Sequence, residues 1–262
     1  MKGSVAIVTG GGTGIGAAVV RRLARRGVAC VINYAHSRAE AEALAAEVGA
    51  GAIAVQADIT EDAACRALVG TALERLGRID FLVNNAGRTK HMAHERLEGL
   101  EAEDFIEIYR LNTIAAFQMT RAASAALGSS SHGAVVNVAS VAGIHGIGSS
   151  IAYAASKGAM ITMTQSLARV LAPKIRVNAV APGYVGTGWF EKALGAEGKA
   201  ALDTRIAGMT PMAMAPQADD IAGPVEMLLD PAGRAITGEV WRVDAGAHLD
   251  VGLSRRPGRE MG

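Results

Sequence analysis

Residues 5–16 read VAIVTGGGTGIG, and this stretch decides the fold. The four apolar residues Val5 to Val8 are followed by Thr9 and then by glycines, and an Ala-rich segment with helical spacing, residues 15–26, comes next. A buried strand, a glycine turn and a helix are the opening unit of an α/β fold. Glycines at such a turn permit positive φ angles and let the backbone approach a phosphate group, which then lies at the positive end of the helix.

The spacing of these glycines differs from the common dinucleotide-binding pattern. Gly10, Gly14 and Gly16 fall at i, i+4 and i+6, whereas that pattern needs glycines at i, i+2 and i+5. A tight connection without a ligand is one interpretation, but the position after the first strand favours a pyrophosphate site. The residues predicted to form it are Gly10, Thr13, Gly14, Ile15 and Gly16.

The same alternation continues along the chain. Short runs rich in Val and Ile are followed by longer Ala-rich segments with helical period, such as residues 38–48 and 61–76. We therefore predict a single-domain, doubly wound α/β fold of the Rossmann type, with seven mostly parallel strands and helices on both faces. The predicted strands are 5–9, 28–33, 52–56, 79–84, 134–140, 175–180 and 239–243.

Other local signals refine this organisation. Residues 186–216 follow the sixth strand at the carboxyl edge of the predicted sheet, where ligands bind in such folds. We expect a lid there, with an ordinary surface excursion as the alternative. The domain is expected to span residues 1–253, and the polar residues 254–262 to form a flexible tail. Ser37 and Glu40 have capping-box spacing, which predicts a helix that begins just after Ser37.

Composition excludes several classes of protein. Half of the 262 residues are apolar and 19% are charged, which excludes a disordered chain. The 26 Lys and Arg residues against 25 Asp and Glu residues leave a net charge of +1, so no positive field is present to bind nucleic acid. Two cysteines suit a reducing compartment. Without a secretory leader or a stretch suited to a membrane, we expect a soluble, cytoplasmic protein.

The end of the second strand bears on the choice of cofactor. A site for NAD commonly carries Asp or Glu about 20 residues after the glycines, where it binds the adenosine ribose. Here residues 33–38 read NYAHSR, with no acid before Glu40. Ser37 and Arg38 are suited to a 2′-phosphate, and Tyr34 is assigned to the same site. NADP(H) is therefore favoured; the alternative is a solvated Arg38 with NAD(H) bound as well.

Tyr153 and Lys157 are candidates for acid–base chemistry. At i and i+4 of a predicted helix, residues 152–172, the phenol and the ammonium lie on one face. Tyrosine titrates near pH 10, and a neighbouring cation lowers its pKa toward neutral pH. Ser140, at the end of the fifth strand, lies at the same carboxyl edge, where its hydroxyl would bind a substrate carbonyl. Taken alone, the Tyr–Lys spacing is also compatible with a chance surface pair.

With these residues in order, the chain resembles the short-chain dehydrogenase/reductase family over about residues 3–250. The resemblance covers nearly the whole chain and includes several independent motifs. They are Thr9 to Gly16, Asp58, Asn84-Asn85-Ala86-Gly87, Asn112, Ser140, Tyr153 with Lys157, Pro182-Gly183 and Thr187.

The resemblance implies a role for each motif. Tyr153 would exchange a proton with the substrate oxygen, Lys157 would lower its pKa and bind the nicotinamide ribose, and Ser140 would orient the substrate. Asn112 would hold a water that links Lys157 to solvent. Further residues would contact the cofactor: Asp58 and Ile59 at the adenine, Val185 and Thr187 at the nicotinamide carboxamide, and Asn85, Ala86, Gly87, Pro182 and Gly183 elsewhere along it.

The resemblance therefore implies an oxidoreductase that moves hydride between NADP(H) and a small-molecule ketone or secondary alcohol. The overall pattern is most similar to 3-oxoacyl-carrier-protein reductases. The alternatives are a sugar or cyclic alcohol dehydrogenase of the same family, and a non-catalytic dinucleotide-binding regulatory protein.

Partners follow from the same resemblance. Two predicted helices, 103–127 and 152–172, are rich in small residues and methionine, and the family pairs such helices across a two-fold axis. We expect a homotetramer, with a dimer as the alternative. Arg88 and Lys90 either contact an anionic substrate group or lie on a plain loop face. His91 and His94 have no carboxylate or cysteine to complete a zinc pattern, so we expect no metal.

Overall fold

Seven strands form one parallel sheet in residues 1–249, the part of the chain that the computed structural model describes. Their order across the sheet is β3-β2-β1-β4-β5-β6-β7, and every neighbouring pair is parallel. The predicted doubly wound α/β fold is thereby confirmed. The strands are β1 (Val5–Val8), β2 (Ala29–Tyr34), β3 (Ile53–Gln56), β4 (Phe81–Asn84), β5 (Ala134–Val138), β6 (Arg176–Pro182) and β7 (Val240–Val243).

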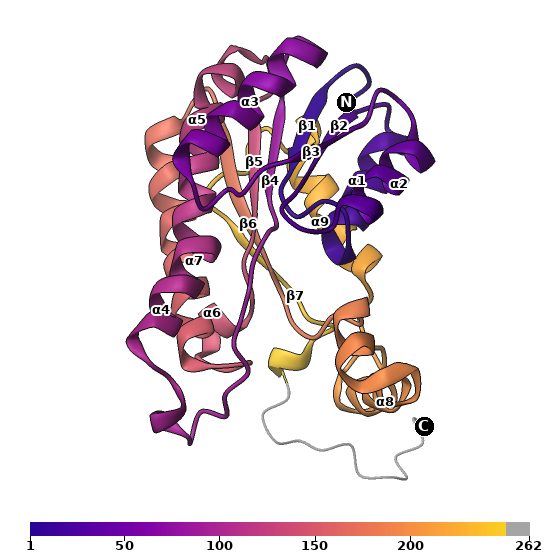
Figure 1. The fold of residues 1–262 in the computed structure, drawn as a ribbon, viewed down its shortest axis with the longest axis vertical. Coiled ribbons are helices and arrows are strands. Elements are labelled where there is room, and N and C mark those ends of the chain that lie inside the picture. The colour runs from indigo at the N-terminus through magenta and orange to yellow at the C-terminus, as the bar shows by residue number, and fades with distance from the viewer. Residues whose placement is uncertain (250–262) are drawn as a thin grey trace.

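Helices cover both faces of the sheet (Figure 1). One hydrophobic core lies between the sheet and the helices α1, α2 and α9, and a second lies between the sheet and α3, α5 and α7. Because the central strands are buried on both faces, they are apolar almost throughout. The helices are α1 (Gly14–Arg25), α2 (Arg38–Val48), α3 (Asp62–Leu76), α4 (Ala102–Tyr109), α5 (Ala115–Ser129), α6 (Ala142–His145), α7 (Ile151–Leu171), α8 (Gly188–Met209) and α9 (Ala218–Leu229).

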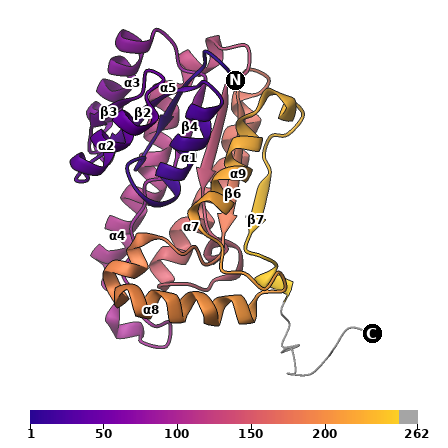
Figure 2. The same ribbon diagram turned by 90° about the vertical axis from the view of Figure 1, so that its right-hand side faces the viewer.

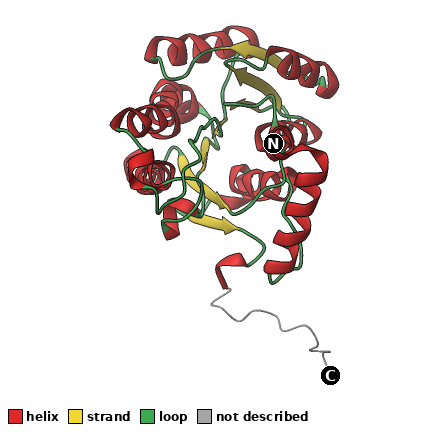
Figure 3. Cartoon of the chain, turned by 60° about the horizontal axis from the view of Figure 1, so that its bottom comes forward, coloured by secondary structure: helices red, strands yellow, loops and turns green. Residues whose placement is uncertain are grey.

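The strand order reverses between β1 and β4. These strands pair directly, although β2 and β3 separate them in the sequence. The connections that leave their carboxyl ends therefore run in opposite directions along the sheet, which leaves a crevice between them. Figure 3 brings this end of the sheet forward. The topology thus places the glycine turn after β1 beside the residues that follow β4.

Two local expectations differ from the structure. The continuous helix predicted over residues 103–127 is divided into α4 and α5 by a π-helical turn, η2 (Arg110–Ile114). Within this turn, Asn112 and Thr113 donate side-chain hydrogen bonds to α7. The predicted capping box is not formed: Ser37 is the N-cap of α2, but its side chain makes no capping bond. Its backbone, with ψ 59°, lies outside the extended region that directs an N-cap side chain onto the helix.

Helix α8 lies at the carboxyl end of the sheet (Figures 1 and 2). It occupies most of the segment 186–216, begins after its N-cap Thr187, and breaks at Gly195, where φ is 72°. The predicted tail, residues 254–262, lies outside the described residues. No helix among residues 1–249 combines the length and the apolar character that crossing a membrane requires.

Helices α6 and α7 touch backbone to backbone. A Cβ atom added at Gly143 would lie 2.4 Å from the carbonyl carbon of Lys157 and 2.5 Å from the nitrogen of Gly158. No side chain fits in this contact. Because Ser140 directly precedes α6 and Tyr153 lies in the first turn of α7, the contact sets the separation of the two elements that carry these residues.

We expect Gly143→Ala to lower the free energy of unfolding by about 1–3 kcal/mol, because the methyl group would force α6 away from α7. The matched control is Gly70→Ala on the exposed face of α3, where an added Cβ meets no atom within 4 Å. That substitution should raise stability by up to about 1 kcal/mol through helix propensity. Urea denaturation measures the free energy of unfolding of both variants. If the two substitutions changed it equally and in the same direction, the proposed close contact at Gly143 would be contradicted.

Candidate active site

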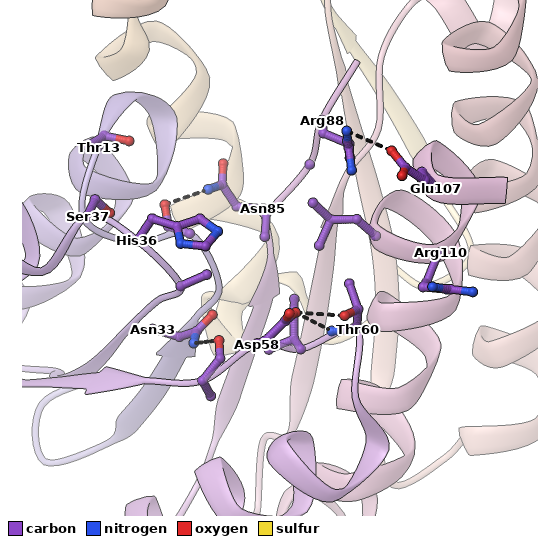
Figure 4. Close-up of a pocket in the computed structure, with 17 residues that line it drawn as sticks. Thr13, Asn33, His36, Ser37, Asp58, Thr60, Asn85, Arg88, Glu107 and Arg110 are labelled. Carbon is purple, nitrogen blue, oxygen red and sulfur yellow. Dashed lines mark hydrogen bonds and ion pairs between the residues drawn. The ribbon is translucent and has the colours of Figure 1, made fainter. Parts of the chain in front are cut away.

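A cavity of about 550 Å³ opens at the carboxyl ends of β1, β2, β3 and β4 (Figure 4). It lies at the switch point of the sheet, where doubly wound folds bind their ligands. Four successive strand-to-helix connections and the start of η2 supply its walls. The lining residues are Gly10, Thr13, Asn33, Ala35, His36, Ser37, Ala57, Asp58, Ile59, Thr60, Asn85, Ala86, Gly87, Arg88, Glu107, Arg110 and Leu111.

The glycine turn is packed too closely for side chains. A Cβ at Gly16 would lie 2.4 Å from the carbonyl oxygen of Gly10. Gly10 itself has a φ of 59°, and a Cβ added there would lie 3.1 Å from the Cα of Ala86. The amide of Asn85 donates to the carbonyl oxygens of Thr9 and Gly10, both at 3.0 Å, which ties the turn to β4. The turn is therefore a fixed cradle at the N-terminus of α1. Such a cradle fits a pyrophosphate, as predicted from the glycines.

The end of β2 corrects part of the predicted cofactor site. Ser37 lines the cavity, but Tyr34 is buried in the core beneath α2. Arg38 points away: it donates to the side chain of Gln56 at 3.3 Å and pairs with Glu42 at 3.5 Å. In this arrangement neither the Tyr34 nor the Arg38 side chain is placed to hold a nucleotide. The ring that enters the cavity is His36, which the sequence reasoning missed.

Asp58 and Ile59 line the cavity where they were predicted, after β3. One carboxyl oxygen of Asp58 accepts hydrogen bonds from the hydroxyl of Thr60 at 2.8 Å and from its backbone N–H at 3.0 Å. These bonds lower the pKa of Asp58, and the neighbouring His36 acts in the same direction. The carboxylate is therefore ionised and held in place by its own turn.

The wall opposite His36 comes from η2 and from the connection after β4 (Figure 4). Asn85, Ala86 and Gly87 line the cavity as predicted. Arg88 pairs with Glu107 at 2.9 Å, and Lys90 pairs with Asp104 at 2.6 Å. The basic loop is thus neutralised by α4, which weakens the case for an anionic substrate group there. Thr60, Glu107, Arg110 and Leu111 also line the cavity and had no distinguishing motif in the sequence.

Tyr153 and Ser140 meet at the neighbouring end of the sheet. The hydroxyl of Ser150 accepts a hydrogen bond from the backbone N–H of Tyr153 at 3.2 Å, which starts α7 and fixes the first turn that carries the phenol. The hydroxyl of Ser140 accepts a hydrogen bond from the N–H of Ala142 at 3.1 Å and forms another with the Tyr153 phenol. The structure therefore brings together the two hydroxyls that were singled out from separate motifs.

The expected lowering of the Tyr153 pKa is not found. Burial of the phenol raises its pKa, and the hydrogen bond to Ser140 opposes this only in part. The Lys157 ammonium lies 5.8 Å from the centre of the Tyr153 ring and donates to the carbonyl oxygen of Val138 at 2.7 Å. Because the ammonium faces β5 rather than the phenol oxygen, it does not offset the cost of burying a phenolate.

Lys157 is itself buried, at 3% exposure. Removal from water lowers the pKa of its ammonium to about 8. A Cβ at Gly87 would lie 3.6 Å from the Lys157 nitrogen, so Lys157 lies directly behind this part of the cavity wall. The Ser–Tyr–Lys group therefore adjoins the cavity at Gly87.

Asn112 joins the two halves of this site. Its side-chain oxygen accepts from the N–H of Arg88 at 2.8 Å, and its amide nitrogen donates to the Arg88 carbonyl and to the Ser156 hydroxyl, both at 3.0 Å. Asn112 therefore clamps the connection after β4 onto α7. Both amide hydrogens are used in this way, and the predicted contact with a water stays a prediction.

The predicted nicotinamide residues surround the start of α8. Thr187 faces the glycine turn, 3.5 Å from where a Cβ of Gly14 would lie, and the N–H of Thr187 donates to the carbonyl oxygen of Val185 at 2.8 Å. Gly183 is packed against Asp244, because a Cβ added at Gly183 would lie 2.8 Å from the Cβ of Asp244. Ile15, Pro182, Gly183, Val185 and Thr187 do not line the cavity described above, and their contacts with a cofactor stay predictions.

We expect Lys157→Met to stabilise the cofactor-free protein at pH 7 by about 2 kcal/mol, because it removes a buried charge and loses one hydrogen bond. The folded pKa of about 8 is below the ordinary 10.5, so the unfolded chain binds more protons between these values. Wild-type stability should therefore rise relative to the variant as the pH increases from 8 toward 10.5. Chemical denaturation at pH 7 and 9.5 measures both, and a pH-independent difference would contradict the assignment.

Comparisons with known proteins agree with this geometry. A family model described as short chain dehydrogenase matches residues 4–197. A candidate ketoacyl reductase of the granaticin polyketide synthase from Streptomyces violaceoruber is 42% identical, over 94% of this chain and 96% of the relative. The 3-oxoacyl-[acyl-carrier-protein] reductase of a Synechocystis strain is 37% identical, over 94% and 97%.

The solved structures give the same result. A candidate short-chain dehydrogenase/reductase from Burkholderia xenovorans superimposes with a TM-score of 0.85 and 38% identity, and the match covers 94% of this chain and 98% of that chain. The family match spans most of the chain, and the relatives match it over nearly their whole length. The chain is an oxidoreductase that acts on a ketone or its alcohol, and it belongs to the short-chain dehydrogenase/reductase family.

Proposed function

We propose that this enzyme is an NADP(H)-preferring reductase of 3-oxoacyl thioesters or similar ketones. The observation that carries the proposal is the adjacency of two features: a cavity of about 550 Å³ lined by Gly87, and behind Gly87 the Lys157 ammonium with the hydrogen-bonded hydroxyls of Ser140 and Tyr153. A dinucleotide in this cavity would be held by the glycine cradle, Asp58 and Asn85. When bound, its nicotinamide supplies or accepts the hydride.

The chain's own residues handle the proton. Burial raises the Tyr153 pKa, so the phenol keeps its proton at neutral pH and is ready to donate it to a carbonyl oxygen. Ser140 donates a second hydrogen bond to that oxygen as negative charge develops. Lys157, with a pKa of about 8, is mostly charged at neutral pH and lies one helical turn along, where it would bind the nicotinamide ribose. At neutral pH the phenol is therefore in the protonated form that reduction of a carbonyl requires.

The substrate class rests on two supports. Relatives over the whole chain are named as reductases of ketoacyl or 3-oxoacyl groups. The wall next to the phenol is apolar: a Cβ at Gly148 would lie 3.9 Å from the Tyr153 ring, and the adjacent Ile147 is 53% exposed. An exposed isoleucine at this place suits an acyl chain better than a sugar. A 3-oxoacyl thioester is therefore the first candidate substrate, and a sugar or cyclic alcohol is the second. A purely regulatory role is set aside because the chain is an enzyme.

The cofactor preference rests on charge. The walls of the cavity at the end of β2 are formed by Asn33, Ala35, His36 and Ser37, with no carboxylate to bind a ribose 2′-hydroxyl. A neutral or positive wall accepts a 2′-phosphate, which an Asp or Glu at the same place would repel. NADP(H) is therefore proposed over NAD(H).

Helix α8 is proposed as the lid over this site. The phenol of Tyr184, just after β6, donates to Asp203 on α8 at 2.7 Å, and Lys199 pairs with the same carboxylate at 2.6 Å. These bonds attach the helix to the connection that carries the predicted nicotinamide residues. The break at Gly195 divides α8 and gives the segment a place to bend.

Assembly is proposed as a homotetramer built on α4, α5 and α7. Large apolar side chains on these helices face solvent: Phe105, Tyr109 and Phe117 are 39–41% exposed, and Val170 is 71% exposed. Apolar residues concentrated on neighbouring helices mark a surface that a partner covers. The free, buried thiols of Cys30 and Cys65 suit a reducing, cytoplasmic setting.

We expect Tyr153→Phe to lower kcat with a 3-oxoacyl thioester and NADPH at least about 100-fold, because the proton donor is lost while the ring stays in place. NADPH affinity, measured by nucleotide fluorescence, should stay within about threefold, since the phenol lies outside the nucleotide cavity. A panel of ketones, sugars and cyclic alcohols with both cofactors identifies the substrate class. Near wild-type kcat in the variant would refute the assignment, and turnover of sugars alone would replace the proposed substrate.

We expect Phe117→Glu combined with Val170→Glu to shift the assembly to a smaller species, because buried, unpaired carboxylates are costly at an interface. Light scattering after gel filtration measures the mass. Glu74→Gln on the exposed face of α3, outside these helices, serves as the control and should leave the mass unchanged. A wild-type protein that runs as a stable monomer would contradict the proposed tetramer.

A further inference from the structure

His36 occupies a distinct place in the nucleotide cavity. It follows β2 by two residues, and its ring enters the cavity next to Ser37 (Figure 4). Thr13 of the glycine turn lines the same side of the cavity. These three residues border the region where a group attached to the adenosine ribose would lie, because an acidic residue at the end of β2 binds that ribose in doubly wound folds.

The arginine beside it has other partners. Arg38 donates to Gln56 at 3.3 Å and pairs with Glu42 at 3.5 Å, and it is absent from the cavity wall. These partners hold its guanidinium along the outer side of α2 and β3. A positive charge for a phosphate at this end of the cavity must therefore come from another side chain.

The other basic side chains that line the cavity lie on the far wall. Arg88 is paired with Glu107 at 2.9 Å, and Arg110 belongs to η2. In Figure 4 both stand across the cavity from His36 and Ser37. Of the described lining residues, His36 is thus the one basic group on the β2 side.

Charged groups face His36 from three elements. Asp58, from the connection after β3, lies close enough that His36 contributes to lowering the pKa of its carboxyl. On α2 the first-turn carboxylate is Glu40, while Arg38 is neutralised by Glu42. From the far wall, Arg88 and Glu107 offset one another, which leaves Arg110 as the opposing positive charge.

We propose that His36, and not Arg38, binds the 2′-phosphate of NADP(H), so that the preference for NADP(H) over NAD(H) strengthens as the pH falls. This inference rests on the proposed function, because it needs a dinucleotide in the cavity. Imidazole gains its charge between about pH 8 and pH 6. A protonated ring would donate a charge-assisted hydrogen bond to the phosphate, whereas a neutral ring offers a weaker one. Ser37 supplies its hydroxyl at either pH.

The test measures binding rather than turnover. Dissociation constants of NADP+ and NAD+ are determined by calorimetry at pH 6.5 and 8.5, and their ratio is compared. A 2′-phosphate itself takes up a proton near pH 6, so the lower pH is kept above that value. For the wild type we expect the preference for NADP+ to be roughly tenfold greater at pH 6.5 than at pH 8.5.

Three variants separate the contributions. His36→Gln keeps a hydrogen-bond donor without a titratable charge, and it should hold the low preference at both pH values. His36→Arg should show a high preference at both, since arginine stays charged. Arg38→Gln is the matched control and should behave as the wild type. NAD+ affinity should stay within about threefold in all three, which shows that the site is intact.

The outcomes are distinct. A pH dependence that persists in His36→Gln, or a preference that disappears in Arg38→Gln, would overturn the role of His36 while leaving the oxidoreductase intact. Tighter binding of NAD+ than NADP+ at both pH values would overturn it as well. Failure of the wild type to bind either dinucleotide would overturn the proposed cofactor site itself, and the inference with it.

Discussion

The bond between the Lys157 ammonium and the Val138 carbonyl oxygen, 2.7 Å long and out of reach of water, is the interaction on which the active site depends. It joins helix α7, which also carries Tyr153, to the end of strand β5. Burial makes the charge costly, and the pKa of about 8 expresses that cost. The fold maintains this arrangement because α6 and α7 are in contact at Gly143, so the helix cannot shift to release the lysine.

The site is divided into two chemically different halves. Around the glycine cradle and Asp58, polar groups are fixed by their own backbone turns, which suits the binding of a charged nucleotide without rearrangement. Around Tyr153, burial keeps the phenol protonated and its wall apolar. Asn112 connects the halves by bonding the connection after β4 to α7, and the π-helical turn that carries it interrupts an otherwise regular helix. A local irregularity of this kind is common where a fold accommodates a functional residue.

The features predicted correctly from the sequence are those set by residues that are close together along the chain. The alternation of apolar runs and helical segments was enough to predict the doubly wound α/β fold, because strands buried on both faces must be apolar over their whole length. The glycine turn, Asp58, Ile59 and the Asn85 segment also lie where their positions after strands placed them. Ser140 and Tyr153 form a hydrogen bond, as expected for two residues predicted at the same edge of the sheet.

The rest depended on directions that a one-dimensional pattern does not contain. Whether Arg38 or His36 faces the cavity depends on the partners that the fold supplies, because Gln56 and Glu42 hold the arginine outside. Whether the pKa of Tyr153 is raised or lowered depends on how deeply the phenol is buried and on where the Lys157 ammonium points, here to the carbonyl oxygen of Val138. The i, i+4 spacing of the two residues fixes neither of these. The sequence by itself therefore determined the fold and the family and named the candidate reacting groups, since these follow from residue type and order. Only the tertiary structure decided protonation and the orientation of side chains toward the cofactor, because both arise from burial and from neighbours that are distant along the chain.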